Sequence, residues 1–389
     1  MKKIMMVSLL LLVSIFIAAC GTSSDNQTKG TTTEPEKSSQ SEKDKSEKEK
    51  AAFIYTAEQG AITKVDGTSN KTIKTIEVEG SVHNVQISPD GTTLGATVVP
   101  GTGGHGEQAC SECSHEEGDE EGHGEGHEEG HGEGHGGDEG EHGQSNGFAL
   151  FFDAETDQLI KKVEVGSHPA HIVFTENMKY ALVTNNEDNN VSVIDLASYK
   201  VIQSISTGKG PHGFRITADS KTAYIANMGE DTVSVIDLVG MKENKKIVVG
   251  NTPVTTGVTS EGKTLVATLN AENSLAIIDL ATEKVEKVQV GEGPAQVYIQ
   301  SDGKYAFVAN QGTPEIPSDS VSKIDFETRE VIATIKVGKG AHGIVTSNDN
   351  QFVYVTNMYD KTVSVIKNDD NSVIATVNVG MEPNGITIK

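Results

Sequence analysis

The sequence predicts an all-β fold, a seven-bladed β-propeller of four-stranded blades, on two observations. The first is an internal repeat: residues 191–195 recur at 233–237 and at 275–279, 42 residues apart each time, and weaker copies end at Asp66, Asp153, Asp325 and Lys367. The second is a series of short apolar runs of period two, separated by Gly and Pro, with no sustained helical period after residue 50. Four strands in about 40 residues are typical of a propeller blade, which must stack on its neighbours to bury its faces.

The two ends of the repeat region predict how the ring of blades closes. The strands of a blade are labelled A to D from the inside outward. The chain enters the repeats on a B strand, residues 52–56, and leaves them on an A strand, residues 385–389. We therefore expect the last strand to complete the blade that the first began, which removes an open sheet edge.

Short strings within the repeats carry a family resemblance. They are Tyr-Val-Thr-Asn at 354–357, Val-Ser-Val-Ile-Asp at 191–195 and 233–237, and Ser-Pro-Asp-Gly at 88–91. These strings resemble the YVTN repeat of the YncE-like β-propellers, and the likeness covers nearly all of the chain from residue 52 except 101–147. That family has mixed functions, so the resemblance implies the fold and leaves the activity open.

The first 50 residues predict export and anchoring. A basic start, an apolar run from Ile4 to Ala19 and small residues before Cys20 are typical of a signal peptide, which is too short for a spanning helix. This segment resembles a bacterial lipobox, which implies a lipoprotein signal peptide at 1–19 and lipid on the Cys20 sulfur. An ordinary signal peptide with an incidental cysteine is the alternative.

Residues 20–50 are almost entirely polar, so we expect a disordered tether. The propeller, residues 51–389, would then be held at the extracytoplasmic face of the cell membrane, in an extracellular setting. The formal net charge of −24 argues against nucleic acid as a partner, because phosphate binding needs clustered Lys and Arg.

Residues 101–147 interrupt the repeat between strands B and C of one blade and are rich in His, Glu and Gly. Because Gly disfavours a helix, we expect a mobile loop. Imidazole, thiolate and carboxylate groups are ligands of zinc and similar metals, so we expect metal binding by His105, Cys110, Cys113, His115, His123, His127, His131, His135 and His142. A solvated spacer with accidental histidines is the alternative.

The metal is predicted to be zinc, with nickel and copper as alternatives. Covalent haem is excluded because Ser114 separates Cys113 from His115. Cys110 and Cys113 are compatible with a disulfide or with metal ligation.

The other five histidines all lie in junctions between strand D of one blade and strand A of the next. Alignment of the junctions places His83, His212 and His342 in one column with Asn384, and His171 one position later. Because A strands line the central channel of a propeller, we expect three or four of His83, His171, His212 and His342 to hold a metal at its mouth. His168 and Asn384 are candidate further ligands, as are the carboxylates of Glu187, Asp188, Glu230 and Asp231.

Polar filling of the channel mouth, without a metal, is the alternative interpretation of these histidines. D-to-A and B-to-C connections emerge on the same face, so the insertion should share the face of the histidines. Metal ligation needs neutral imidazole, so affinity should weaken as the pH falls through about 6.5.

The expected function is a lipid-anchored metal-binding propeller that captures or buffers zinc or delivers it to a metal-transport protein. The chain is similar in fold and composition to the zinc-chaperone propellers of some bacterial zinc importers. We expect no enzyme, because no nucleophile has a flanking base and the chain lacks the Trp of quinoprotein propellers. A surface scaffold or adhesion propeller that binds a protein partner and a metal-dependent, lactonase-like hydrolase are the alternatives.

Two recurrent polar residues are expected to be structural. Asp ends most C strands, where its carboxylate should cap the following turn. Asn ends most B strands, as at Asn185, Asn227, Asn310 and Asn357, and should satisfy nearby backbone groups.

Overall fold

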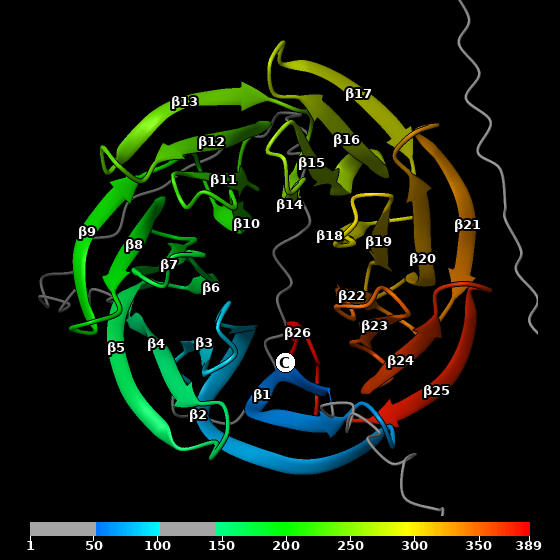
Figure 1. Ribbon diagram of the computed structural model, residues 1–389, viewed down its shortest axis with the longest axis horizontal. Helices are drawn as coiled ribbons and strands as arrows, with labels where there is room; N and C mark the ends of the chain where they lie inside the picture. Colours follow the sequence, from blue (N-terminus) through cyan, green and yellow to red (C-terminus); the bar gives the residue numbers. More distant parts are fainter. Residues whose placement is uncertain (1–51, 102–144) are drawn as a thin grey trace, which may run out of the picture. The chain divides into compact units, whose positions relative to one another are not determined.

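The computed structural model describes residues 52–101 and 145–389, all within one compact unit of strands. The predicted signal peptide, Cys20, the predicted tether and the side chains of the insertion that are predicted to bind metal lie outside the described residues. The strands form six sheets, five of four strands and one of six strands, arranged around a central axis (Figure 1). The prediction of an all-β propeller is confirmed.

Each blade runs outward from strand A to strand D by antiparallel pairing of consecutive strands. The A strands are β6 (Pro169–Phe174), β10 (Pro211–Ile216), β14 (Pro253–Val258), β18 (Pro294–Ile299), β22 (Ala341–Thr346) and β26 (Ile386–Ile388). The B strands are β3 (Thr93–Val99), β7 (Tyr180–Asn185), β11 (Thr222–Asn227), β15 (Thr264–Leu269), β19 (Tyr305–Gly312) and β23 (Phe352–Asn357).

The C strands are β4 (Asn146–Asp153), β8 (Asn190–Asp195), β12 (Thr232–Asp237), β16 (Ser274–Asp279), β20 (Pro317–Asp325) and β24 (Thr362–Lys367). The D strands are β5 (Leu159–Ser167), β9 (Lys200–Ser206), β13 (Lys242–Val248), β17 (Lys284–Gln289), β21 (Glu330–Lys336) and β25 (Ser372–Asn378). A short 3-10 helix, η1 (Asn270–Glu272), lies between β15 and β16.

Two long strands, β1 (Phe53–Asp66) and β2 (Lys71–Ile87), each serve two strand positions. The first part of β1 pairs with β26 and its second part with the start of β2, while residues 81–87 of β2 pair with β3. The six-stranded sheet therefore contains two blades, which makes seven with the five separate sheets. Seven buried apolar clusters lie between successive blades, as a closed ring of seven requires.

The predicted closure is confirmed by the pairing of the terminal strands. Ile54 and Thr56 of β1 face Ile388 and Ile386 of β26, and the hydroxyl of Thr387 accepts a hydrogen bond from the Ile87 N–H at 3.1 Å. The ring is thus joined by non-covalent contacts between the two ends of the propeller.

Removal of residues 386–389 should therefore destabilise the whole ring. The truncation loses the buried side chain of Ile386 and leaves the edge of β1 unpaired, so we expect the free energy of unfolding to fall by about 4 kcal/mol or more. Urea unfolding followed by circular dichroism measures this, and an unchanged midpoint would show that β26 does not close the ring.

Recurrent polar residues have the expected structural roles. The carboxylate of Asp237 accepts hydrogen bonds from the N–H groups of Val239 and Gly240, and Asp153, Asp195, Asp279 and Asp325 cap their turns in the same way. Asn185 Oδ1 accepts from the Gly166 N–H at 3.0 Å.

Within the described ranges, no helix is long and apolar enough to cross a bilayer.

Candidate metal centre

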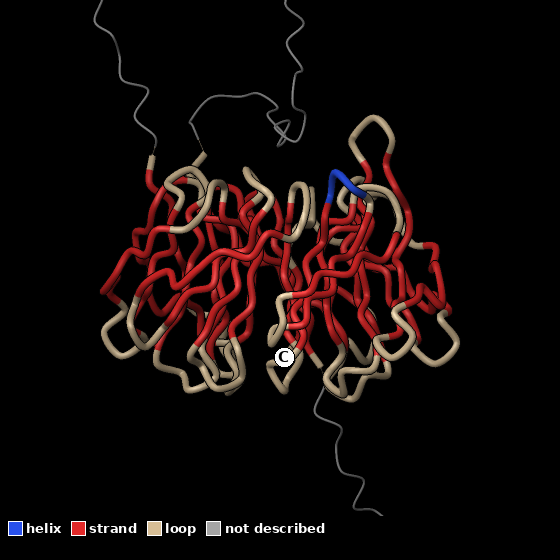
Figure 2. The backbone as a smooth tube through the Cα atoms, turned by 90° about the horizontal axis from the view of Figure 1, so that it is seen from above, coloured by secondary structure: helices blue, strands red, loops and turns tan. Residues whose placement is uncertain are grey.

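The D-to-A junctions and the B-to-C connections share one face of the propeller. Backbone hydrogen bonds join them blade after blade: Asn186 N–H donates to the carbonyl of His168, and Met228 N–H donates to that of Gly210. Figure 2 shows η1, a B-to-C connection, at this face. Gly147, beside the insertion, approaches Pro169 so closely that a Cβ there would lie 2.3 Å from the proline Cδ.

A repeated irregularity near the start of the A strands β6, β10, β14, β18 and β22 sets two successive residues opposite a single residue of the B strand. In β10 the pairing with β11 jumps from Pro211 to Phe214, so His212 and Gly213 form a bulge. The same jump spans Ala170 and His171 in β6, and β2 has a related shift beside His83. A bulge adds a residue and redirects side chains, so residues one position apart in the alignment reach the same place.

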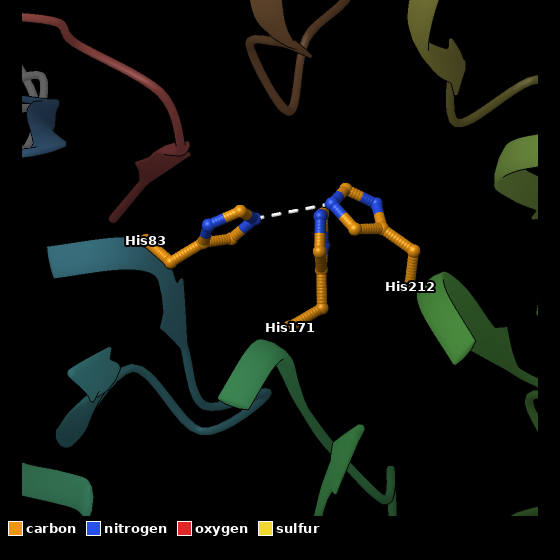
Figure 3. Close-up of side chains that lie close together, drawn as sticks. All are labelled: His83, His171 and His212. Atoms are coloured by element: carbon orange, nitrogen blue, oxygen red, sulfur yellow. Dashed lines mark hydrogen bonds between the residues drawn. The ribbon is translucent and has the colours of Figure 1, made fainter. Parts of the chain in front are cut away.

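His83, His171 and His212 converge from the A strands of three consecutive blades (Figure 3). One nitrogen from each ring lies within 4.8 Å of those of the other two. The His83 and His212 rings lie 5.1 Å apart and the His171 and His212 rings 4.9 Å apart, measured between centroids. His83 reaches His212 across the intervening blade, whose residue in the same column is the small Ala170.

The tautomer of His212 is fixed by the backbone. Its Nδ1 lies 3.2 Å from the carbonyl oxygen of Val254, which can only accept, so Nδ1 carries the proton and Nε2 has a lone pair. In the metal-free protein this lone pair accepts a hydrogen bond from His83 Nε2 at 3.2 Å, and a metal would take the place of the shared proton. Two nitrogen ligands on one tetrahedral zinc ion are separated by about 3.3 Å, so the spacing suits a shared metal.

The third histidine has an unsatisfied nitrogen. His171 is 2 % exposed, and its Nε2 has no hydrogen-bond partner among the described residues. A buried polar atom left unpaired costs free energy, and a metal would satisfy it.

All three imidazoles are held neutral. Burial, followed by the neighbouring histidines, lowers the pKa of His83 and His171 well below 6.5, and burial lowers the pKa of His212 to about 3. The imidazoles therefore stay competent to bind metal in mildly acidic solution. From the sequence alone, the affinity for metal was expected to weaken as the pH falls through about 6.5. Because burial lowers these pKa values, the weakening is now expected at lower pH.

The other predicted ligands are placed differently. His342 is 8 % exposed and its Nδ1 donates to the Asn384 carbonyl at 3.2 Å, but it is not part of the three-histidine group. Asn384 contributes that backbone oxygen. His168 lies 6.1 Å from His83 between ring centroids, and its Nδ1 is 3.5 Å from a Glu187 carboxylate oxygen.

Two of the acids proposed as oxygen ligands have structural partners instead. Asp188 accepts a hydrogen bond from the Ser167 N–H at 2.9 Å. Glu230 pairs with Lys246 at 3.1 Å. The group at the axis consists of neutral nitrogen donors alone.

Thr184 fixes the spacing of two of the histidines. Its hydroxyl accepts from the His171 N–H at 3.0 Å and donates to the His212 carbonyl at 2.8 Å, so it links two blades. Thr268 makes the same bridge between Thr255 and Ala295, neither of which is a histidine.

This repeat allows a matched prediction. Thr184→Val and Thr268→Val each leave a buried N–H and a buried carbonyl without this partner, so both should lower the free energy of unfolding by about 2 kcal/mol. Only Thr184→Val should also weaken zinc binding, by about 10-fold or more. Urea unfolding and zinc titration of both variants measure these effects, and equal zinc affinities would show that Thr184 does not position the site.

Sequence reasoning missed a pair of polar residues one level deeper along the axis. Arg215 of β10 places its guanidinium carbon 5.8 Å from the ring centroid of Tyr298 of β18. The sequence signal was available, because Arg215 is one of only two arginines in the chain, with Arg329.

Comparisons with known proteins agree with the propeller fold. A family model described as a lactonase, 7-bladed beta-propeller, matches residues 150–316, less than half of the chain. No curated protein matches the sequence. The hydrazine synthase of Kuenenia stuttgartiensis is 20 % identical, with a TM-score of 0.62 over 81 % of this chain and 92 % of that chain.

Two further solved structures are similar in fold. A functionally unknown protein from Desulfotomaculum acetoxidans is 13 % identical, with a TM-score of 0.65 over 87 % of this chain and 98 % of that one. A putative 6-phosphogluconolactonase from Bacteroides fragilis is 12 % identical, with a TM-score of 0.65 over 89 % of this chain and 100 % of that one. The likeness to YVTN-repeat and zinc-chaperone propellers stays a prediction.

The expectation that the chain is not an enzyme is contradicted by these comparisons. The finding that overturns it is the match of residues 150–316 to a lactonase family model, because lactonases are enzymes. The absence of a nucleophile with a flanking base does not exclude an enzyme, because a metal centre can activate water without either group. The chain is a β-propeller similar to the lactonase propellers, with three histidines able to bind a metal at its axis.

Proposed function

We propose that the chain binds a divalent transition metal, zinc before nickel or copper, at His83, His171 and His212. The observation that carries this proposal is the convergence of three neutral imidazoles, with two Nε2 atoms 3.2 Å apart and a third Nε2 buried without a partner. A set of nitrogen donors without carboxylates suits zinc, copper and nickel better than magnesium or calcium.

The proposed role of this site is capture, buffering or delivery of the metal outside the cytoplasm. The predicted lipid on Cys20 would keep the protein at the membrane, and the ligands of the insertion would supply additional, weaker sites. The described base of the insertion, at Gly147, lies against Pro169, two residues from His171. A metal-transport protein is the proposed recipient.

Zinc titration of two chains tests this role. One is the full chain, and the other has residues 102–144 replaced by a short Gly-Ser linker between Gly101 and Ser145. In competition with a chromophoric chelator, we expect one tight site in both chains and additional weaker sites only in the full chain. If the shortened chain has no tight site, the axial metal centre is wrong.

A metal-dependent hydrolase is the second candidate, favoured by the match of residues 150–316 to the lactonase family model. Three histidine ligands leave a fourth coordination position, as in catalytic zinc sites, where the metal activates a water molecule. The test is hydrolysis of simple lactones by the zinc-loaded chain. This activity should be lost on addition of a chelator and in His212→Gln, and activity that survives both would exclude the metal as its source.

A further inference from the structure

Arg215 is a cation on an inner strand without a carboxylate partner. Within the described part of the chain it belongs to no ion pair, and its guanidinium makes one hydrogen bond, from Nη1 to the Phe214 carbonyl at 2.9 Å. A partly buried arginine usually has an acidic partner, because desolvation of the charge is costly. Four of the five guanidinium N–H groups remain available.

The position of Arg215 gives it access to the axis. The residue is partly exposed, although β10 is the innermost strand of its blade (Figure 1). Its charge also contributes to the low pKa of His171, behind the effects of burial and of the neighbouring histidines, so it lies within electrostatic range of the three-histidine group.

Tyr298 approaches Arg215 from two blades away. Arg215, Gly257 and Tyr298 occupy the same register position in β10, β14 and β18, where they pair with Tyr224, Val266 and Phe307. The intervening residue is a glycine, so no side chain of β14 separates the guanidinium from the ring at this level. Among the described residues, the Tyr298 hydroxyl has no hydrogen-bond partner, so it adds a donor beside the arginine.

We propose that Arg215 and Tyr298 bind an oxyanion, a carboxylate or a phosphate group of a small molecule, next to the three-histidine group. A guanidinium offers paired N–H groups that match the oxygens of either anion. Among the described residues, no carboxylate forms an ion pair with Arg215, and Glu176, which adds to the effect of burial in raising the pKa of Tyr298, is exposed. The anion would supply the missing counter-charge.

The proposed anion site is separate from the proposed metal site, and either can be present without the other. The metal-free full chain is titrated calorimetrically with citrate and, separately, with inorganic phosphate at pH 7 and low ionic strength. We expect one of them to bind at a single site. Binding of citrate alone identifies a carboxylate ligand, binding of phosphate alone identifies a phosphate ligand, and no binding of either in the millimolar range overturns the proposal.

The second arginine of the chain provides the matched control. Arg215→Gln should lower the affinity for the bound anion at least 10-fold, and Tyr298→Phe about 3-fold, whereas Arg329→Gln, at a surface pair with Glu286, should leave it unchanged. Equal effects of the two arginine variants would refute the site. If Arg215→Gln does not fold, Arg215→Lys keeps the charge but loses the paired N–H groups, and it should still weaken binding; unchanged affinity in this variant would also overturn the proposal.

Discussion

His212→Gln is expected to lower the zinc affinity of the tight site at least about 100-fold. Changes to groups that merely orient metal ligands cost 10- to 100-fold, so loss of a ligand should cost more. His212 is central to the group, because its ring lies about 5 Å from both other rings and its Nδ1–H is held by Val254. Glutamine keeps a polar side chain of similar length at the position.

His342→Gln is the matched control for this experiment. His342 occupies the equivalent position in β22, is equally buried and donates its Nδ1–H to the next blade in the same way. Because it lies outside the three-histidine group, its replacement should change the affinity less than about 3-fold. Both variants are measured by chelator competition in the chain that lacks residues 102–144. Equal losses of zinc affinity in the two variants would show that His342 is a fourth ligand. Unchanged affinity in both variants would show that the metal does not bind at the axis.

The sequence predicted the architecture because the repeat is a strong signal. A spacing of 42 residues between strings such as 191–195 and 233–237 specifies one blade per repeat, and the strand order at the two ends specifies the closure. The convergence of His83, His171 and His212 followed from their common place in the D-to-A junctions.

Which of the histidines meet at the axis depends on strand bulges and on contacts between blades, and neither can be read from the local sequence. His171 and His212 differ by one position in the alignment, and only the bulge in each A strand lets both reach the same point. His342 was grouped with them because the alignment cannot tell which blades are close enough across the axis. The pairing of Arg215 with Tyr298 joins blades that are not neighbours, so no repeat pattern could reveal it.

The metal-free protein should lose stability as the pH falls from about 6.5 toward 5. In the unfolded chain a histidine takes up a proton near pH 6.5, whereas in the folded chain burial lowers the pKa of His212 to about 3 and that of His342 to about 4. Below pH 6.5 the unfolded state therefore binds more protons and is favoured. The stability that these neutral imidazoles contribute is complete above pH 6.5 and is lost progressively as the pH falls toward the folded-state pKa values.

Each histidine with a lowered folded-state pKa should reduce the free energy of unfolding by about 1.4 kcal/mol per pH unit, or by roughly 2 kcal/mol between pH 6.5 and 5. Urea unfolding of the metal-free chain and of His212→Gln at pH 7, 6 and 5 isolates one of them, because titrating groups that the two chains share largely cancel in the difference. The free energy of unfolding of the variant should fall less steeply with decreasing pH, by about that slope. Parallel pH profiles would mean that the folded protein protonates His212 as easily as the unfolded chain does, and an imidazole so accessible to protons would not be the buried metal ligand that the geometry indicates.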